Sequence, residues 1–415
     1  MKFAFLTYVY PDYARAFYDH RIALASQSYE TQYTALAEDS LSWNGALAPA
    51  MAPLGFEVME VISHIKPLQQ AWARENGVRW PAISWQTEIP LQQIKCFKPD
   101  ILVVAAPRAF NRCWIARLRR ECPSLRATVG FYCSPSRDID TVRSHDAVLS
   151  CTRGLVEEFS TAGIRSYYFR HGFNKAVLKS LPKRGAVDTK VCFIGNLVRG
   201  PGYHLGRERL LETLVDNLKI DIYSPQVSQY VRNDTVKTGL KRVAYLIAML
   251  LRYCGFSEVQ LSKLPHLGRA ATLSRLPMSQ ISPKLKSYIK APVYGLEMFR
   301  TLLDSAVALN SHIDMAGNEA ANIRLFEVTG VGSCLLTDWK ENLHELFEID
   351  REIVAYKSVE ECIEKGRWLL ENPREREMIA AAGQARTLRE HTFDQRAAQL
   401  AVVLRRIVCS KSNGD

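Results

Sequence analysis

Residues 305–338 read SAVALNSHIDMAGNEAANIRLFEVTGVGSCLLTD and carry the pattern that decides the fold. Two short apolar runs, Ser305–His312 and Ser333–Asp338, are typical of buried strands in a parallel sheet. The segment between them is long enough for a loop and a short helix. Strand, helix and strand in that order form a crossover unit, and ligands of such folds bind at the carboxyl ends of the strands.

We expect the connecting helix to begin near Asn318 or Ala321 and to end at Gly330, because glycine commonly supplies the left-handed residue after a helix. Loop 311–322 then lies at the carboxyl ends of the strands. A helix start offers unpaired N–H groups to a phosphate, and Arg324 adds a forked cationic donor. The alternative is that Arg324 and Glu327, at helical spacing, form an ion pair without function.

The pair Glu319-x7-Glu327, followed by a glycine-rich turn, resembles the nucleotide-sugar-binding half of GT-B glycosyltransferases. The chain is most similar to the CgeB-like (spore-maturation-protein-like) glycosyltransferases, whose Asn-x-Arg-x-Phe-Glu core matches Asn322-Ile-Arg324-Leu-Phe-Glu327. The resemblance covers about residues 190–405, although a Glu at position 319 is less typical of that subgroup. Further matching residues lie in the C-terminal part: Tyr356, Ile379, Ala380, Gly383, Arg386, His391 and Thr392.

The first half of the chain independently predicts an α/β fold. Five apolar runs alternate with helix-length segments, and this order indicates a doubly wound parallel sheet. The runs are Lys2–Tyr8, Glu57–Ile62, Pro99–Ala105, Ala127–Tyr132 and Ala147–Cys151. With the resemblance, this implies a GT-B fold of two Rossmann-like domains that face each other across a cleft.

We therefore expect three parts of the chain. Residues 1–178 form an N-terminal, acceptor-side domain, and residues 189–390 form the nucleotide-sugar-binding domain. A basic helical insertion occupies about residues 226–290 of the second domain. Residues 391–415 form a terminal helix that crosses back to the first domain, as the resemblance implies.

The resemblance also implies roles for individual residues. Arg324 neutralises the leaving pyrophosphate, Glu327 holds the ribose, and Glu319 contacts the donor sugar or its phosphates. The loop after the first strand of the second domain faces the donor phosphates. Arg324, the helix start and Arg199 of this loop replace a divalent cation at the pyrophosphate, so no metal ion or other cofactor is expected. The remaining donor-site candidates are Gly195, Asn196, Arg199, His312, Asn322 and Thr337.

Three residues of the first domain are acid or base candidates for the acceptor hydroxyl: Asp138, His20 and His171. Asp138 follows a strand that delivers its loop to the interdomain face, and His20 follows a tyrosine-rich loop after the first strand. Asp138-Ile-Asp140 also matches the Asp-x-Asp spelling of a metal-bound nucleotide-sugar site. We prefer a metal-free interpretation, because alternating aspartates are frequent in loops.

Residues 231–290 contain eleven Lys or Arg against Asp234 and Glu258, so they hold +9 of the chain's net charge of +11. Within them, the stretch 240–253 joins apolar residues to cations and tyrosines, as in an interfacial helix. The alternatives are contact with an anionic membrane or a lipid-linked acceptor, and packing of an inserted helical hairpin. No nucleic-acid partner is expected.

The ten cysteines lack paired metal-ligand spacing and include Cys192 and Cys334 in apolar strands, so we expect free thiols and no structural zinc. The longest apolar run, Val243 to Leu251, is shorter than the ~20 residues of a spanning helix. We expect a cytoplasmic protein, with peripheral attachment to the inner face of the membrane as an option.

The sequence thus predicts a metal-independent transferase that moves a sugar from a nucleotide-diphosphate sugar to a hydroxyl of a glycan, a lipid-linked acceptor or a small molecule. Its expected setting is bacterial cell-surface or secondary glycan synthesis. Two alternatives stay open: a GT-B-fold nucleotide-sugar epimerase, and a non-enzymatic protein that binds polyanions or membranes.

Overall fold

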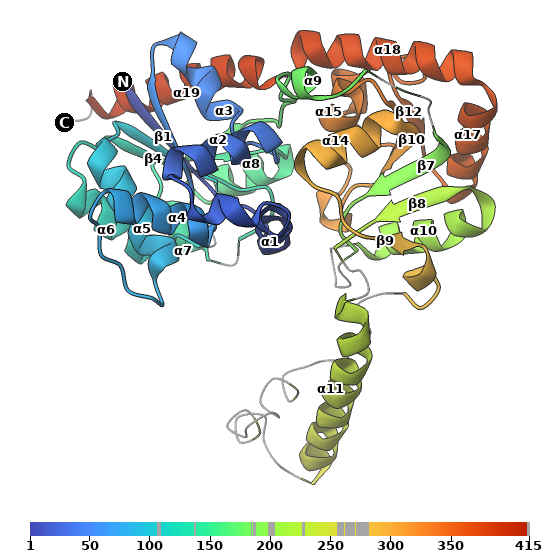
Figure 1. The fold of residues 1–415 in the computed structure, drawn as a ribbon, viewed down its shortest axis with the longest axis horizontal. Coiled ribbons are helices and arrows are strands. Elements are labelled where there is room, and N and C mark those ends of the chain that lie inside the picture. The colour runs from blue at the N-terminus through green and yellow to red at the C-terminus, as the bar shows by residue number, and fades with distance from the viewer. Residues whose placement is uncertain are drawn as a thin grey trace. The chain divides into compact units, whose positions relative to one another are not determined.

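The computed structural model describes residues 1–105, 109–136, 138–183, 185, 188–197, 204–225, 229–254, 261, 270 and 282–412. It contains two six-stranded sheets, and every described strand pairing is parallel (Figure 1). The predicted α/β class is confirmed, since the strands of each sheet alternate with helices along the chain.

The first sheet has the strand order β2-β1-β3-β4-β5-β6. Its first five strands lie where the apolar runs predict them, within one or two residues. The strands are β1 (Lys2–Thr7), β2 (Glu57–Ile62), β3 (Ile101–Val104), β4 (Ala127–Phe131), β5 (Ala147–Ser150) and β6 (Ser166–Tyr168). The helices between and after them are α1 (Pro11–Asp19), α2 (Tyr29–Asp39), α3 (Leu47–Met51), α4 (Lys66–Glu75), α5 (Trp85–Phe97), α6 (Arg112–Glu121), α7 (Ile139–Arg143), α8 (Arg153–Thr161) and α9 (Val177–Ser180).

Both faces of this sheet are covered, because side chains alternate between the faces along a strand. In β1, Phe3 and Phe5 belong to one buried cluster, whereas Ala4 and Leu6 belong to another. Helices α5 and α6 contribute to the second cluster, for example through Leu118. This two-sided burial is why the strands of the sequence are nearly continuous apolar runs.

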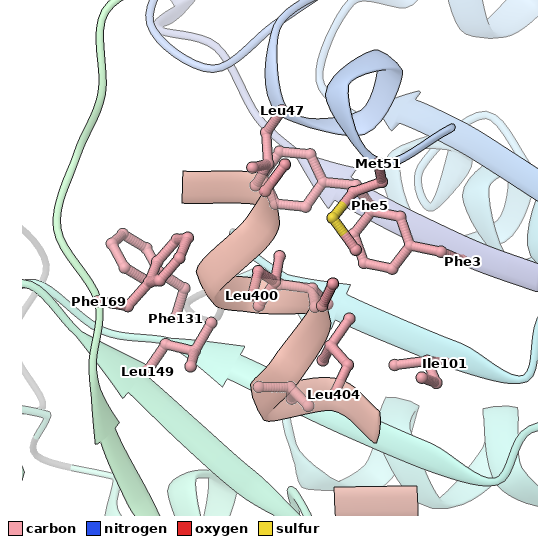
Figure 2. Close-up of a cluster of buried hydrophobic side chains, with 14 of the residues drawn as sticks. Phe3, Phe5, Leu47, Met51, Ile101, Phe131, Leu149, Phe169, Leu400 and Leu404 are labelled. Carbon is pink, nitrogen blue, oxygen red and sulfur yellow. The ribbon is translucent and has the colours of Figure 1, made fainter. Parts of the chain in front are cut away.

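The last helix, α19 (Phe393–Ser412), covers the other face of the first sheet and lies beside α3 (Figure 1). Its Leu400 and Leu404 are fully buried among Phe3, Phe5 and Met51 (Figure 2). The beginning and the end of the chain therefore share one hydrophobic core.

The second sheet has the order β12-β11-β10-β7-β8-β9. Its strands are β7 (Asp188–Ile194), β8 (Ile220–Tyr223), β9 (Ile289–Lys290), β10 (Ser305–Asn310), β11 (Cys334–Asp338) and β12 (Val354–Tyr356). Its helices are α10 (Leu205–Asn217), α11 (Gln229–Tyr253), α14 (Gly295–Asp304), α15 (Arg324–Gly330), α16 (Leu343–Leu346), α17 (Val359–Glu371) and α18 (Pro373–Glu390).

Helix α15 ends at Gly330 as expected, but its start and the position of the left-handed residue after it differ from the expectation. The helix begins at Arg324 rather than near Asn318 or Ala321. The preceding residues stay irregular because side chains hold them: the Asn322 amide donates to Asn310 Oδ1 at 3.0 Å, and the Ala320 N–H donates to Asn342 Oδ1 at 2.7 Å. The left-handed residue after α15 is Gly332, with φ 81°, and Gly330 is still helical.

Gly330 is small for a different reason. A Cβ atom there would lie 2.4 Å from the ring of Phe173, which no real contact allows. The ring of Phe173 also packs edge-on against Phe299 of α14, with ring centroids 6.1 Å apart. Glycine at position 330 therefore lets the segment after β6 approach α15 closely.

The chain divides into two compact units. One comprises Met1–Thr189, Tyr294–His312 and Ala316–Asp415, and the other comprises Lys190–Val293 and Ile313–Met315. The boundaries expected at residues 178, 189 and 390 stay predictions. Among the described residues, no helix has the length and apolarity that crossing a bilayer requires. Residues 226–228, 255–260, 262–269 and 271–281 of the expected basic insertion lie outside the described residues.

Candidate functional site

A buried polar network lies at the carboxyl ends of β10, β11 and β12. The Asn310 amide donates to Thr337 Oγ1 at 3.0 Å, while its Oδ1 accepts from Asn322. The Tyr356 hydroxyl donates to the Asn310 carbonyl oxygen at 3.2 Å. Asn310 thus joins the loop before α15 to β11 and β12, and it brings the predicted donor-site residues Asn322 and Thr337 together.

His312 and Asp338 form an ordered pair beside this network. Asp338 Oδ1 accepts the His312 N–H at 3.0 Å and lies 2.7 Å from His312 Nδ1. Burial acts to raise the pKa of Asp338, but hydrogen bonds and charge from His312, with Lys340, lower it overall. The ionised carboxylate fixes the imidazole with Nδ1 protonated.

The second ring nitrogen of His312 has no such partner. His312 Nε2 is buried without a hydrogen-bond partner among the described residues. With Nδ1–H bound to Asp338, Nε2 is an acceptor, and it suits a hydroxyl or another donor of a ligand. Sequence analysis named His312 and missed Asp338, although Asp338 ends the same quoted stretch.

Arg324 and Glu327 form the ion pair that their spacing indicates, with 2.8 Å between Arg324 Nη1 and Glu327 Oε2. It is not a surface pair, because the exposed side-chain fractions are 18% and 6%. Glu327 Oε2 receives no aligned hydrogen bond from a described residue. The pair therefore keeps a buried acceptor that a sugar hydroxyl can satisfy.

Tyr10, in the loop after β1, interacts electrostatically with the Arg324–Glu327 pair. Although about half of Tyr10 is exposed, loss of water around its hydroxyl raises the pKa to about 12; Tyr8 and the Glu327 carboxylate add to this effect while Arg324 opposes it. The tyrosine-rich loop that was expected on the acceptor side therefore lies within electrostatic reach of α15.

Glu319 is engaged with another segment. Its Oε2 accepts the backbone N–H of Arg153, the first residue of α8, at 2.6 Å. The Arg153 guanidinium binds Glu345 of α16 through both nitrogens, and Arg170 donates to the same carboxylate at 3.1 Å. Glu319 thus satisfies a free donor of a helix start. Its predicted donor-sugar role stays a prediction.

Some of the C-terminal residues that match the CgeB-like family pack around α15 and α18. His391 packs on Phe326 of α15 with ring centroids 4.9 Å apart, and its Nε2 lies 2.9 Å from the Leu346 carbonyl oxygen. A Cβ at Gly383 would lie 2.3 Å from the Glu352 carbonyl oxygen, so α18 approaches closely only with glycine there. His391 and Gly383 therefore help to hold α15 and α18 in position.

The loop after β7 belongs to the second compact unit. The Gly195 N–H donates to the Tyr223 carbonyl oxygen at 3.0 Å, and Arg207 Nη1 donates to the Asn196 carbonyl oxygen at 2.8 Å. These bonds fix the backbone at the carboxyl end of β7. Arg199 lies outside the described residues, so its predicted contact with donor phosphates is still open.

The three acid or base candidates of the first sheet lie in different settings. Asp138 is the N-cap of α7, where its Oδ1 accepts the Thr141 N–H at 3.0 Å. Hydrogen bonds from Thr141 lower the pKa of Asp138. His20 is exposed at the end of α1, and His171 packs against Trp43 and lies 3.8 Å from the Cys133 sulfur. A base role for any of them stays a prediction.

A family model described as glycosyl transferase-like matches residues 267–401, about a third of the chain. The match includes β10, α15 and β11, and thus the buried polar network. Solved structures share the whole fold. Anabaena HepE in complex with UDP and glucose matches with a TM-score of 0.53 at 10% identity, over 98% of this chain and 100% of that chain.

The chain has the GT-B fold. Sucrose-phosphate synthase from Thermosynechococcus elongatus matches with a TM-score of 0.50 and 10% identity, over 99% of this chain and 100% of that one. AviGT4, a glycosyltransferase involved in avilamycin A biosynthesis, matches with a TM-score of 0.50 and 12% identity, over 88% of each chain. No curated protein sequence matches the chain. The family model and these GT-B neighbours together support a glycosyltransferase.

Proposed function

We propose that this protein transfers a sugar from a nucleotide-diphosphate sugar to a hydroxyl acceptor. The observation that carries the proposal is the buried polar network at the carboxyl ends of β10 and β11, with the Arg324–Glu327 pair beside it and with His312 Nε2, which no described residue hydrogen-bonds. This is where parallel α/β sheets bind ligands. The complexes of HepE with UDP and with UDP-glucose support the donor class.

In this proposal Arg324 exchanges part of its contact with Glu327 for the donor pyrophosphate, and Glu327 accepts from the ribose. Fixed positive charge at the leaving group stabilises the charge that develops there, so transfer proceeds without a divalent cation at the phosphates. Helix α15 has only seven residues, so Arg324 and not the helix dipole supplies most of the positive charge. His312, held by Asp338, positions a donor hydroxyl.

We also infer two finer points. The Asn322-Ile-Arg324-Leu-Phe-Glu327 core supports a CgeB-like enzyme of bacterial cell-surface or secondary glycan synthesis. The apolar residues Leu240, Val243, Ile247 and Leu250 of α11 are exposed, and Lys241 lies among them. This combination favours contact with an anionic membrane surface, where a lipid-linked acceptor is held.

The test is turnover of UDP-, GDP- and TDP-sugars with and without a mixture of glycan and lipid-linked acceptors, read as nucleotide release and as product mass. We expect acceptor-dependent nucleotide release that added Mg²⁺ or Mn²⁺ does not change. Arg324→Lys should lower the rate strongly, because an ammonium cannot reproduce the forked contact. Arg300→Lys, at an exposed position of α14, is the matched control.

Epimerisation of the donor sugar in the absence of an acceptor would contradict the proposal and show that the protein is a nucleotide-sugar epimerase. Absence of turnover with every donor, in protein that melts cooperatively, would contradict an active transferase. A rate that rises steeply with added Mg²⁺ would contradict the metal-independent donor site alone.

A further inference from the structure

Cys133, Cys151 and His171 come together although they lie 18 or more positions apart along the chain. Cys133 follows β4, Cys151 follows β5, and His171 follows β6, and these three parallel strands are neighbours in the sheet. The carboxyl ends of neighbouring parallel strands meet at one edge, so the topology itself gathers the three side chains. This edge is also where α/β folds bind ligands.

The ligand atoms are already close to the spacing of a metal site. Two sulfur atoms and one ring nitrogen all lie within 4.8 Å of one another, and Cys133 Sγ is 3.8 Å from His171 Nε2. Tetrahedral Zn²⁺ with its usual Zn–S and Zn–N bond lengths places sulfur and nitrogen roughly 3.5 Å apart. A movement of a few tenths of an ångström therefore closes the Cys133–His171 pair on an ion.

The surroundings hold this arrangement. Cys151 is buried, and the His171 ring packs edge-on against Trp43 and Phe131, with centroid distances of 5.2 and 5.7 Å. The His171 carbonyl oxygen accepts from Arg396 Nε at 2.7 Å, which fixes its backbone. His171 Nδ1 is buried without a hydrogen-bond partner among the described residues, so contacts with the thiols dominate the polar environment of the ring.

We propose that Cys133, Cys151 and His171 bind one Zn²⁺ ion. Two thiolates and an imidazole are ligands that this ion prefers. Cys133 is exposed, so the fourth position faces solvent and takes water or a ligand. This inference goes beyond the proposed sugar transfer and does not depend on it. It gives His171 the role of a metal ligand, in place of the acid or base predicted from the sequence.

The experiment uses the full chain, reduced with a non-thiol reductant and freed of metal, and titrates it with Co²⁺ as a spectroscopic probe. Tetrahedral Co²⁺ bound by thiolates gives strong visible d–d bands and a sulfur charge-transfer band. We expect both bands to saturate at one ion per chain and to disappear when Zn²⁺ is added. Cys133→Ser and His171→Gln should each weaken Co²⁺ binding by more than about 100-fold, beyond the usual loss from an outer-shell change.

Cys113→Ser, at another exposed cysteine, is the matched control and should leave the titration unchanged. Cys133→Ser decides the result if His171→Gln unfolds, because the Cys133 side chain is exposed and its exchange should not disturb the core; circular dichroism verifies both folds. Absence of the charge-transfer band, or a titration that survives Cys133→Ser, would overturn the proposal. So would a Cys133–Cys151 disulfide, found as two missing thiols in unreduced protein.

Discussion

Glu60 on β2 is a buried carboxyl group away from the proposed site. Burial raises its pKa to about 7 from the ordinary value of 4.5, and hydrogen bonds from the Gly45 N–H and the Tyr33 hydroxyl limit the rise. A raised folded-state pKa means that its contribution to stability is fully present below pH 4.5 and is lost as the pH rises through about 7.

We predict that Glu60→Gln stabilises the protein relative to wild type as the pH rises from about 5 to about 8. The amide keeps an oxygen acceptor for Tyr33 and Gly45 and never ionises. The difference in unfolding free energy between Glu60→Gln and wild type should grow by up to ~3 kcal/mol, because each unit of pKa shift corresponds to about 1.4 kcal/mol. Urea denaturation at several pH values measures it, with exposed Glu30→Gln as control. A difference independent of pH would contradict the raised pKa.

At the proposed site, helical spacing in the sequence is enough to pair Arg324 with Glu327. The partners of other candidates depend on strand register and on distant segments. His312 binds Asp338 because β10 and β11 pair so that Asn310 lies opposite Thr337. Glu319 binds the N–H of Arg153, 166 positions away, and no local pattern predicts that contact.

Among the elements, the strands were the most predictable, because two-sided burial makes them apolar runs. The start of α15 was not, since the side chains of Asn322 and Asn342 hold the preceding segment irregular. The Cys133–Cys151–His171 cluster was missed for a related reason. Its ligands come from three strand ends and have no short spacing that a sequence motif would contain.

Helix α19 should be a major source of stability, since it fills one face of the first sheet. Leu400 is fully buried among residues of β1 and α3 (Figure 2). We predict that Leu400→Ala costs ~2–5 kcal/mol of unfolding free energy, the usual range for a buried leucine. Val402→Ala, on the exposed side of the same helix, should change it by less than about 0.5 kcal/mol. Equal effects in urea denaturation would show that α19 does not complete the core.

Helix α11 gives the second prediction at this scale. Leu246→Glu combined with Ile247→Glu should abolish co-sedimentation with anionic vesicles at low salt, because both exposed apolar side chains would become charged. Val402→Glu, an exposed apolar position of α19, is the control and should bind as wild type does. Absence of wild-type binding to anionic vesicles, or equal binding to zwitterionic ones, would contradict electrostatic membrane contact.

For the whole molecule, the alternation of strands and helices predicted the first parallel sheet, and the resemblance implied the second; the solved GT-B neighbours share this architecture. The expected boundaries between the parts of the chain stay predictions. The chain returns after residue 293 to the compact unit that contains its first residues, and α19 packs on the first sheet. The return of the terminal helix was expected from the resemblance, because tertiary packing of this kind leaves only weak traces in composition.

The most direct test of the account is a thermal-shift panel of UDP, GDP, TDP, ADP and CMP on wild type, Arg324→Ala and Glu327→Gln, with Arg300→Ala as control. A ligand at one hundred times its dissociation constant stabilises the folded state by ~2.7 kcal/mol. We predict a rise in Tm with one nucleoside diphosphate, retained in Arg300→Ala and lost or much reduced in the two site variants. A shift that survives both site variants, or no shift with any nucleotide, would contradict a donor site at the ends of β10 and β11.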